Sequence, residues 1–182
     1  MADLTGRIVG AMQADVKTFT EIENDPAAMT QAVTVIVIAG VAALIGNFFR
    51  AGIGSGIVAL ISSLLGYALF SFLVFIIGTK VMPEPATKAS FEEAFRVIGF
   101  AAAPGVFSVL AIIPFLGPLI SFLIAIWSLV IAVIAVREVL DYTNTGRAII
   151  VCLIAGVICL IVMMLVMLPL LGALFIARAV TG

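Results

Sequence analysis

The chain has 182 residues, of which 64% are hydrophobic and only 10% are charged, and its formal net charge is −1. A soluble domain is roughly 45–50% apolar and about 25% charged, so this composition excludes a soluble enzyme, a disordered chain and a nucleic-acid-binding protein with its basic face. The chain has no histidine, so a histidine base, metal ligand or haem ligand is also excluded. We therefore expect a polytopic membrane protein.

Residues 3–23 are predicted to form one amphipathic helix, the main part of a cytoplasmic arm that covers residues 1–25. Its apolar side chains recur at helical spacing, and most charged side chains fall elsewhere on the helix. Such a helix lies at a membrane interface. Two uses of its apolar face remain open, namely packing on the chain's own bundle or docking a partner. The candidate surface residues of the arm are Leu4, Ile8, Met12 and Phe19.

The rest of the chain, residues 26–178, is predicted to be a transmembrane domain, because a spanning helix needs about 20 mostly apolar residues. Residues 97–136 contain no charge, and as one helix they would be about 60 Å long, roughly twice the hydrocarbon thickness. The prolines and glycine of residues 114–118 favour a turn that divides this run. The five predicted spans cover residues 31–49, 57–79, 97–114, 118–136 and 148–176.

The distribution of basic residues predicts the orientation of these spans. If the N-terminus is cytoplasmic, the inner segments hold seven Lys and Arg residues, and the outer segments hold only Arg50 and Arg178. Cytoplasmic loops carry an excess of Lys and Arg. We therefore expect a cytoplasmic N-terminus, an external C-terminus and a first span that acts as an uncleaved anchor.

Several local signals shape the predicted helices. Ser90 and Glu93 have the spacing of a capping box, which predicts that the third helix begins near residue 90. Pro104 lies inside the third span, where it removes a backbone hydrogen bond and is expected to kink the helix. Pro169 is the expected kink point of the fifth span.

The predicted membrane interior offers no catalytic or ion-translocating chemistry. Residues 27–49, 57–79, 97–136 and 148–177 contain no Asp, Glu, Lys, Arg or His, whereas ion pumps and proton-coupled carriers need such groups. The serines are expected to hydrogen-bond between helices. Cys152 and Cys159 lie about 10 Å apart along a helix, beyond disulfide reach. We expect no catalytic residue, no metal and no cofactor.

Small residues mark the third span as a close-packing helix. Gly99 and Ala103 form a small-x-x-x-small pair ahead of Pro104, and such pairs let membrane helices approach closely. This surface is either internal packing or a groove for a lipid or a partner helix, and Trp127 would lie near such a groove. We take Gly99, Ala103, Pro104 and Trp127 as the second set of candidate surface residues.

Several segments resemble the Yip family of membrane proteins, particularly its bacterial members. The resemblance is carried by residues 99–101, Pro104, residues 113–115, Trp127, residues 135–137, 140–142 and 145–148, and by residues 23–28 before the first span. It implies five spans with a cytoplasmic N-terminus. Eukaryotic members bind Rab-type GTPases and carry an acidic-Leu-Tyr-Gly-Pro stretch before the first span. Residues 22–28 do not match that stretch, so GTPase binding is not expected here.

We therefore expect an all-α, five-span bundle in a bacterial cytoplasmic (inner) membrane. The first functional hypothesis is a non-enzymatic binding, scaffolding or accessory subunit of a membrane complex. The alternative is a lipid-handling or small-molecule transport protein. The expected partners are membrane lipids and other integral membrane proteins, and no nucleic acid.

Overall fold

The computed structural model describes the backbone of residues 3–113 and 115–181, and the side chains of these residues except 47–57, 59 and 170–181. It is all-helical over this part of the chain. Five helical segments are long and apolar enough to cross a membrane, which confirms the predicted five-span helical bundle. These spans are Ala28–Gly46, Leu60–Val81, Phe91–Ile112, Gly117–Val139 and Thr145–Pro169.

The arm consists of two helices, α1 (Leu4–Met12) and α2 (Val16–Asn24), so the prediction of one helix over residues 3–23 was wrong. The chain reverses at Ala14, which has a positive φ of 57°. Asp15 then caps α2 by accepting hydrogen bonds from the amides of Lys17 and Thr18. Gly10 permits the reversal, because a Cβ atom there would collide with the side chain of Thr18. The turn folds α1 back against α2.

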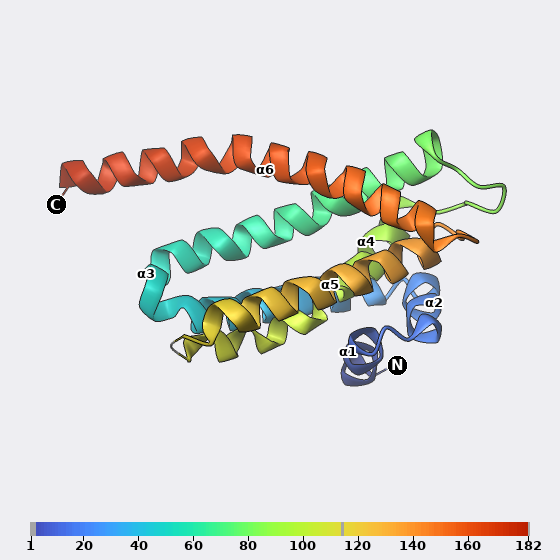
Figure 1. The fold of residues 1–182 in the computed structure, drawn as a ribbon, viewed down its shortest axis with the longest axis horizontal. Helices are drawn as coiled ribbons and strands as arrows, with labels where there is room; N and C mark the ends of the chain where they lie inside the picture. The colour runs from blue at the N-terminus through green and yellow to red at the C-terminus, as the bar shows by residue number, and fades with distance from the viewer. Residues whose placement is uncertain (1–2, 114, 182) are drawn as a thin grey trace.

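The first two spans lie in one long helix, α3 (Ala28–Ile76), and not in two helices separated by a loop. In Figure 1, α3 runs to the far end of the molecule and bends back toward its starting end. The backbone stays helical through residues 47–59. A short π-helix, η1 (Ile77–Val81), completes the second span.

The third span combines two helix types. It begins with α4 (Phe91–Phe100), whose capping box of Ser90 and Glu93 is present as predicted. It continues as the 3-10 helix η2 (Ala103–Ile112), with Pro104 in its first turn. The expected kink is therefore a change of helix type, because proline cannot donate the α-helical hydrogen bond at this position. The helix begins at Phe91, next to the predicted residue 90, and entry into the membrane at residue 97 stays a prediction.

The third span is the centre of the bundle. In its apolar stretch, 61% of the residues are buried inside the bundle, whereas the corresponding share in each of the other four spans is 17–28%. It packs along the first half of α3, where glycines bring the backbones together: a Cβ atom at Gly99 would lie 2.9 Å from Cβ of Ala32, and one at Gly105 would lie 2.7 Å from Cβ of Ala39. Side-chain volume at these positions therefore sets the helix separation.

The last two helices, α5 (Gly117–Val139) and α6 (Thr145–Thr181), run antiparallel and expose many large apolar side chains. Figure 1 shows α6 beside the second half of α3, while α5 meets α6 at the turn that joins them and diverges from it toward the far end of the molecule. Helix α6 continues through Pro169, the expected kink point, and is gently curved in Figure 1.

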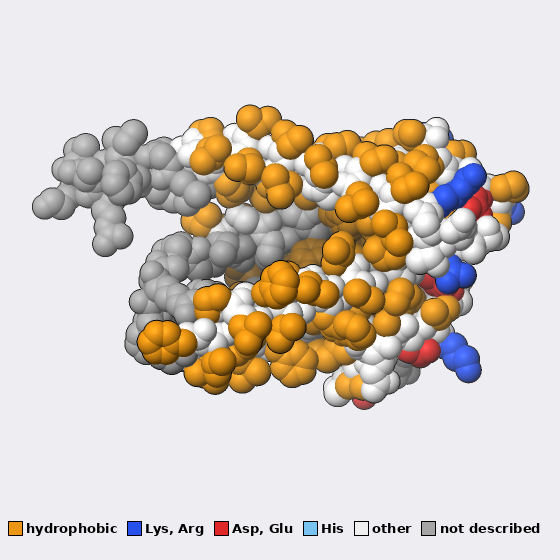
Figure 2. All heavy atoms as spheres, in the orientation of Figure 1, with side chains coloured by type: hydrophobic (Ala, Val, Ile, Leu, Met, Phe, Trp, Pro, Cys, Tyr) orange, Lys and Arg blue, Asp and Glu red, His pale blue; other side chains and the backbone are white. Residues whose placement is uncertain are grey.

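Charged side chains gather at one end of the bundle. Figure 2 shows the Lys, Arg, Asp and Glu side chains of the visible face at the end that carries the arm, while the long sides are covered by apolar side chains. We call this end, formed by residues 3–27, 80–96 and 137–147, the charged end. Its assignment to the cytoplasm stays a prediction from the excess of basic residues in these segments.

Candidate functional site

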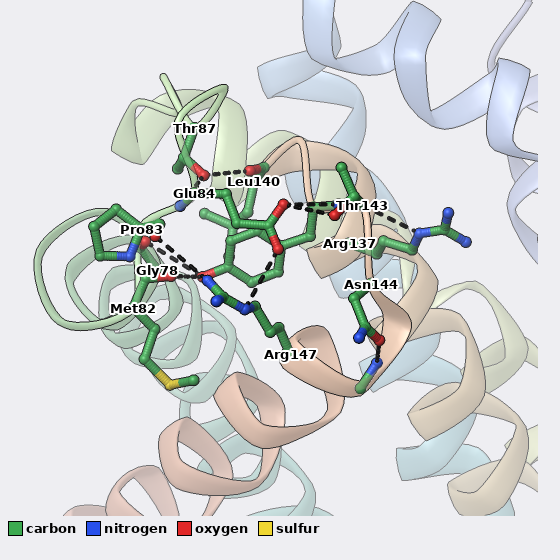
Figure 3. Close-up of polar contacts among 12 residues, drawn as sticks. Gly78, Met82, Pro83, Glu84, Thr87, Arg137, Leu140, Thr143, Asn144 and Arg147 are labelled. Atoms are coloured by element: carbon green, nitrogen blue, oxygen red, sulfur yellow. Dashed lines mark hydrogen bonds and ion pairs between the residues drawn. The ribbon is translucent and has the colours of Figure 1, made fainter.

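Two loops at the charged end are joined by a network of hydrogen bonds that we call the loop clamp (Figure 3). The carboxylate of Glu84 accepts hydrogen bonds from the amide and the hydroxyl of Thr143, each at 3.0 Å. It also lies 3.5 Å from Nε of Arg147, the first charged residue of α6. The amide of Thr143, then its hydroxyl and the charge of Arg147, hold the pKa of Glu84 below its usual range. The clamp thus favours an ionised Glu84.

Tyr142 anchors the clamp to the end of the second span. Its side chain is 4% exposed, and its hydroxyl lies 2.7 Å from the carbonyl oxygen of Met82 and 3.3 Å from that of Gly78. The hydroxyl of Thr87 donates to the carbonyl of Leu140 at 2.7 Å. The hydroxyl of Tyr142 thus binds backbone acceptors at the end of η1, where the π-helical geometry disturbs the regular pattern. The hydroxyl of Thr87 binds an acceptor at the end of α5. The clamp therefore fixes the second, fourth and fifth spans to one another.

Arg7 holds the arm together. It is only 4% exposed, and its Nη2 lies 2.8 Å from Oε1 of Glu21 and 2.6 Å from Oδ2 of Asp25. Its Nη1 donates to Oε1 of Gln31 on α3 at 2.8 Å. The hydrogen bond from Arg7 and the amide of Ala27 lower the pKa of Asp25. Sequence reasoning missed this site, although Arg7 sits between Leu4 and Ile8 on the apolar face, which is a signal of a buried and paired charge.

Arg96 connects the arm to the third span. It is 8% exposed, and its Nη2 donates to the backbone carbonyl of Glu23 at 2.6 Å. Burial raises the pKa of Glu23 to about 7, and repulsion from Asp141, Glu93 and Glu138 adds to the shift. The end of α2 thus carries a carboxyl group that titrates near neutral pH.

The structure brings two candidate residues, Met12 and Trp127, into contact. The indole nitrogen of Trp127, in the middle of α5, donates to the carbonyl of Met12 at 2.8 Å. The hydroxyl of Thr20 donates to Oε1 of Glu138 near the end of α5 at 2.7 Å. The arm therefore lies along the side of the bundle, and both α1 and α2 are hydrogen-bonded to α5.

The other candidate residues of the arm face the bundle. Phe19 is fully buried, and Leu4, Ile8 and Met12 are partly buried against the hydrophobic core. This placement corresponds to the first of the two uses left open by the sequence, packing on the chain's own bundle. A partner could reach Phe19 only if the arm moved away.

The second candidate set is also internal, apart from Trp127. Gly99, Ala103 and Pro104 are buried, and Gly99 is in close contact with α3 at Ala32. Their packing corresponds to the intramolecular alternative. Trp127 is 44% exposed and is the member of this set that reaches the surface.

Two apolar grooves open on the sides of the bundle within the predicted spans. The inner groove lies between α3 and α6, and has a volume of about 390 Å³. The outer groove lies between α5 and α6 near the charged end, and has a volume of about 450 Å³. The inner groove is lined by Ser63, Gly66, Tyr67, Phe70, Gly156, Cys159, Leu160 and Met163. The outer groove is lined by Leu129, Val130, Val133, Ile134, Thr145, Ile149, Cys152 and Leu153.

The described side chains of these sites form hydrogen bonds, ion pairs and apolar contacts within the chain. Among the described residues, no group of three or more His, Cys, Asp or Glu side chains is arranged to hold a metal ion. Cys152 and Cys159 are free thiols, and each lines a different groove. The polar groups at the charged end hold loops and arm in place, and the grooves offer apolar surface to the membrane.

Comparison with known proteins identifies the family. A family model described as the Yip1 domain matches residues 9–167. Neither a search of curated proteins nor a search of solved structures gave a significant match. The Yip1 family is not a known enzyme family. Because the matched segment includes part of the arm, the first four spans, nearly all of the fifth and the loop clamp, this chain belongs to the Yip1 domain family and is an integral, multi-pass membrane protein.

Proposed function

We propose that this protein is a non-enzymatic scaffold or accessory subunit that binds a membrane helix of another protein in its inner groove. The observation that carries the proposal is a pair of glycines without neighbours: a Cβ atom at Gly66 or at Gly156 would have no other atom within 4 Å. Both glycines line the inner groove. Small residues in membrane helices serve close helix approach. Here α6 reaches Gly66 only through the thiol of Cys159, 3.6 Å from the carbonyl oxygen of Gly66, and the space above both α-carbons stays open.

Other glycines of the bundle show the contrast. Gly99 and Gly105 are each in close contact with α3, and Gly78 is covered by the side chain of Leu140. Within the chain, close packing thus accounts for these glycines and leaves Gly66 and Gly156 available for a helix from outside.

Tyr67 supports a protein occupant of the inner groove. It lines the groove, and its hydroxyl has no hydrogen-bond partner among the described residues. Hydrocarbon offers no acceptor for a phenolic hydroxyl, whereas a partner helix offers backbone carbonyls and polar side chains. The groove therefore suits a helix that brings one acceptor.

The loop clamp and the arm support a scaffolding role. They fix the charged ends of α3, α5 and α6 to one another without leaving a reactive cluster among the described residues. A bundle held in this way presents its groove in a constant shape, which reduces the entropy lost on binding.

Co-purification tests the proposal. The chain is extracted from its own membrane in a mild detergent, and we expect one membrane protein to co-purify in near-stoichiometric amount. Gly156→Leu fills the groove and should abolish co-purification. Val157→Leu adds bulk at a neighbouring position that is 58% exposed and does not line the groove, and it should retain the partner. A lone chain in the unmodified sample, or equal loss in both variants, would contradict the proposal.

The second candidate function is lipid handling, and the outer groove favours it. This groove is almost entirely apolar and opens between two helices that face the membrane. In proteoliposomes, a lipid-handling protein changes the distribution of a labelled lipid between leaflets. An unchanged distribution would remove this candidate.

We also propose that the protein resides in the inner membrane of a bacterium with its charged end in the cytoplasm. The bias of basic residues toward that end supports the orientation. A protease site added before Leu4 should be cut only from the cytoplasmic side of the membrane. Cutting from the outside would reverse the orientation.

A further inference from the structure

We propose that the outer groove and Arg137 together form a binding site for an anionic phospholipid from the leaflet at the charged end. An acyl chain lies in the groove, and the phosphate binds the guanidinium group of Arg137. This inference goes beyond partner binding in the inner groove, since it concerns a different pair of helices and requires no second protein.

The outer groove has the chemistry of an acyl-chain site. Its walls come from α5 and α6 inside the membrane spans, and it lies between α6 and α5 on the face seen in Figure 2. Leu129 and Leu153, which line it, are 55% and 56% exposed. A volume of about 450 Å³ lies in the range of ligand pockets.

Arg137 lies at the end of the groove that faces the headgroup region. It follows Val133 by four residues and Ile134 by three, so it shares their face of α5 one turn nearer the charged end. Its Nε donates to the carbonyl of Tyr142 at 3.2 Å, in the turn that closes the groove. Figure 3 shows its guanidinium directed away from the Glu84–Arg147 pair. Arg137 is thus held in position by one nitrogen.

The remaining nitrogens of Arg137 are available. Neither Nη atom of Arg137 has an acceptor among the residues that the structure describes. Arg7 and Arg147 pair with carboxylates. Arg96 also binds through one nitrogen, but it is only 8% exposed and a headgroup cannot reach it. A guanidinium group matches phosphate oxygens in a two-pronged geometry. Arg137 is exposed, so a headgroup can reach it.

The surroundings favour an anion. Thr145, the first residue of α6, lines the groove, and its hydroxyl has no hydrogen-bond partner in the described part of the chain. The start of a helix adds a favourable potential for a negative group. Two nearby carboxylates are engaged elsewhere, since Glu138 accepts from Thr20 and Glu84 binds Thr143 and Arg147. The third, Asp141, is exposed in the turn between α5 and α6.

The charge of Arg137 and its position at the end of the outer groove indicate which molecule the groove binds. A groove with apolar walls that ends at an arginine and a hydroxyl matches a molecule with an apolar chain and an anionic head. A partner helix would cover the groove without supplying a phosphate at that position. Anionic lipids are attracted to basic residues next to a span.

Native mass spectrometry of the full chain in mild detergent tests the site. The protein is incubated with phosphatidylglycerol or with phosphatidylcholine, and we expect only phosphatidylglycerol to stay bound. Arg137→Gln should weaken its retention by about tenfold or more, because hydrogen bonds between charged groups contribute at least that factor. Arg137→Lys, which keeps the charge and loses the two-pronged geometry, should weaken it less.

Matched variants separate this site from general surface effects. Lys88→Gln removes an exposed charge of the same sign at the same end of the bundle and should retain the lipid. Ile149→Trp fills the groove, whereas Ile150→Trp alters a neighbour that is 46% exposed and outside it; only the former should release the lipid. An unfolding measurement in lipid-free detergent shows whether each variant is folded. If a tryptophan variant does not fold, Arg137→Gln still tests the site.

Four results would overturn the inference. Equal retention of phosphatidylcholine would show that the headgroup charge is not recognised, and equal loss in Lys88→Gln would show a nonspecific charge effect. Full retention in a folded Ile149→Trp would place the acyl chain elsewhere. Equal thermal stabilisation by inorganic phosphate alone would make the ligand a free anion and not a lipid.

Discussion

The third span and α6 show opposite relations between hydrophobicity and burial. The third span has the lowest mean hydropathy of the five and is 61% buried, whereas the fifth span, in α6, has the highest mean hydropathy and is 17% buried. In water the order would be reversed. In a membrane, lipid solvates apolar side chains as well as a neighbouring helix does, so burial follows small residues and backbone fit. Close contacts at glycines therefore distinguish the buried third span from the exposed helix α6.

The largest expected effect comes from adding volume to the third span. Gly99→Leu would place a side chain against Ala32, whose Cβ is already 2.9 Å from the position of an added Cβ. We expect a loss of about 2–3 kcal/mol in the free energy of unfolding, because a packed interior adjusts poorly to extra volume. Denaturant titration in detergent measures it, and an unchanged midpoint would contradict the close packing of α4 and α3.

A smaller loss is expected where the loop clamp joins the spans. Tyr142→Phe removes the hydrogen bond to the carbonyl of Met82 and leaves a buried acceptor without its donor. The expected cost is about 1–2 kcal/mol in the free energy of unfolding. The matched control is Thr143→Val, which removes a hydroxyl contact from the exposed rim of the same clamp. Equal costs in both variants would mean that burial of Tyr142 adds nothing.

On α6 the same kind of residue should respond with the opposite sign. Gly156→Ala places a methyl group where no atom lies within 4 Å and replaces the glycine with a better helix former. The expected change is a gain of about 0.5–1 kcal/mol in the free energy of unfolding. Gly99→Ala is the control and should be destabilising. A loss in both variants would show that α6 packs as tightly as the third span.

The most local effect is confined to the arm at the edge of the third span and depends on pH. The pKa of Glu23 is raised to about 7 in the folded chain from an ordinary value of 4.5, so docking of α2 favours its protonated form. The stability that protonation of Glu23 adds to the docking of α2 is fully present below pH 4.5, and it is lost as the pH rises through about 7. Hydrogen exchange of α2 amides should therefore accelerate between pH 5 and pH 8, after correction for the intrinsic exchange rate.

Glu23→Gln provides the matched test of this pH dependence. It keeps the backbone carbonyl that binds Arg96 and removes the titrating group, so the corrected exchange rate should become insensitive to pH. If the pH dependence persists in this variant, another group at the charged end controls the arm.

Much of the architecture was predictable because it depends on local composition. Four uncharged apolar runs, one of them divided by the turn at residues 114–118, predicted the five spans. Ser90 and Glu93 predicted the start of α4. The reversal at Ala14 was missed because a regular apolar pattern continues through it, and only the contact of Gly10 with Thr18 reveals the second helix. The sites were less predictable, since Arg7 and Gln31 or Glu84 and Thr143 meet only after folding.

The sequence alone determined that this chain is a helical membrane protein of the Yip type with its charges outside the spans, because the cost of placing charged and unpaired polar groups in hydrocarbon is set residue by residue. Only the tertiary structure decided which glycines are covered, which arginines pair with a carboxylate and which spans border a groove. Those properties depend on distances between residues far apart in the chain. In lipid, no difference in hydrophobicity indicates in advance which face of an apolar helix turns inward.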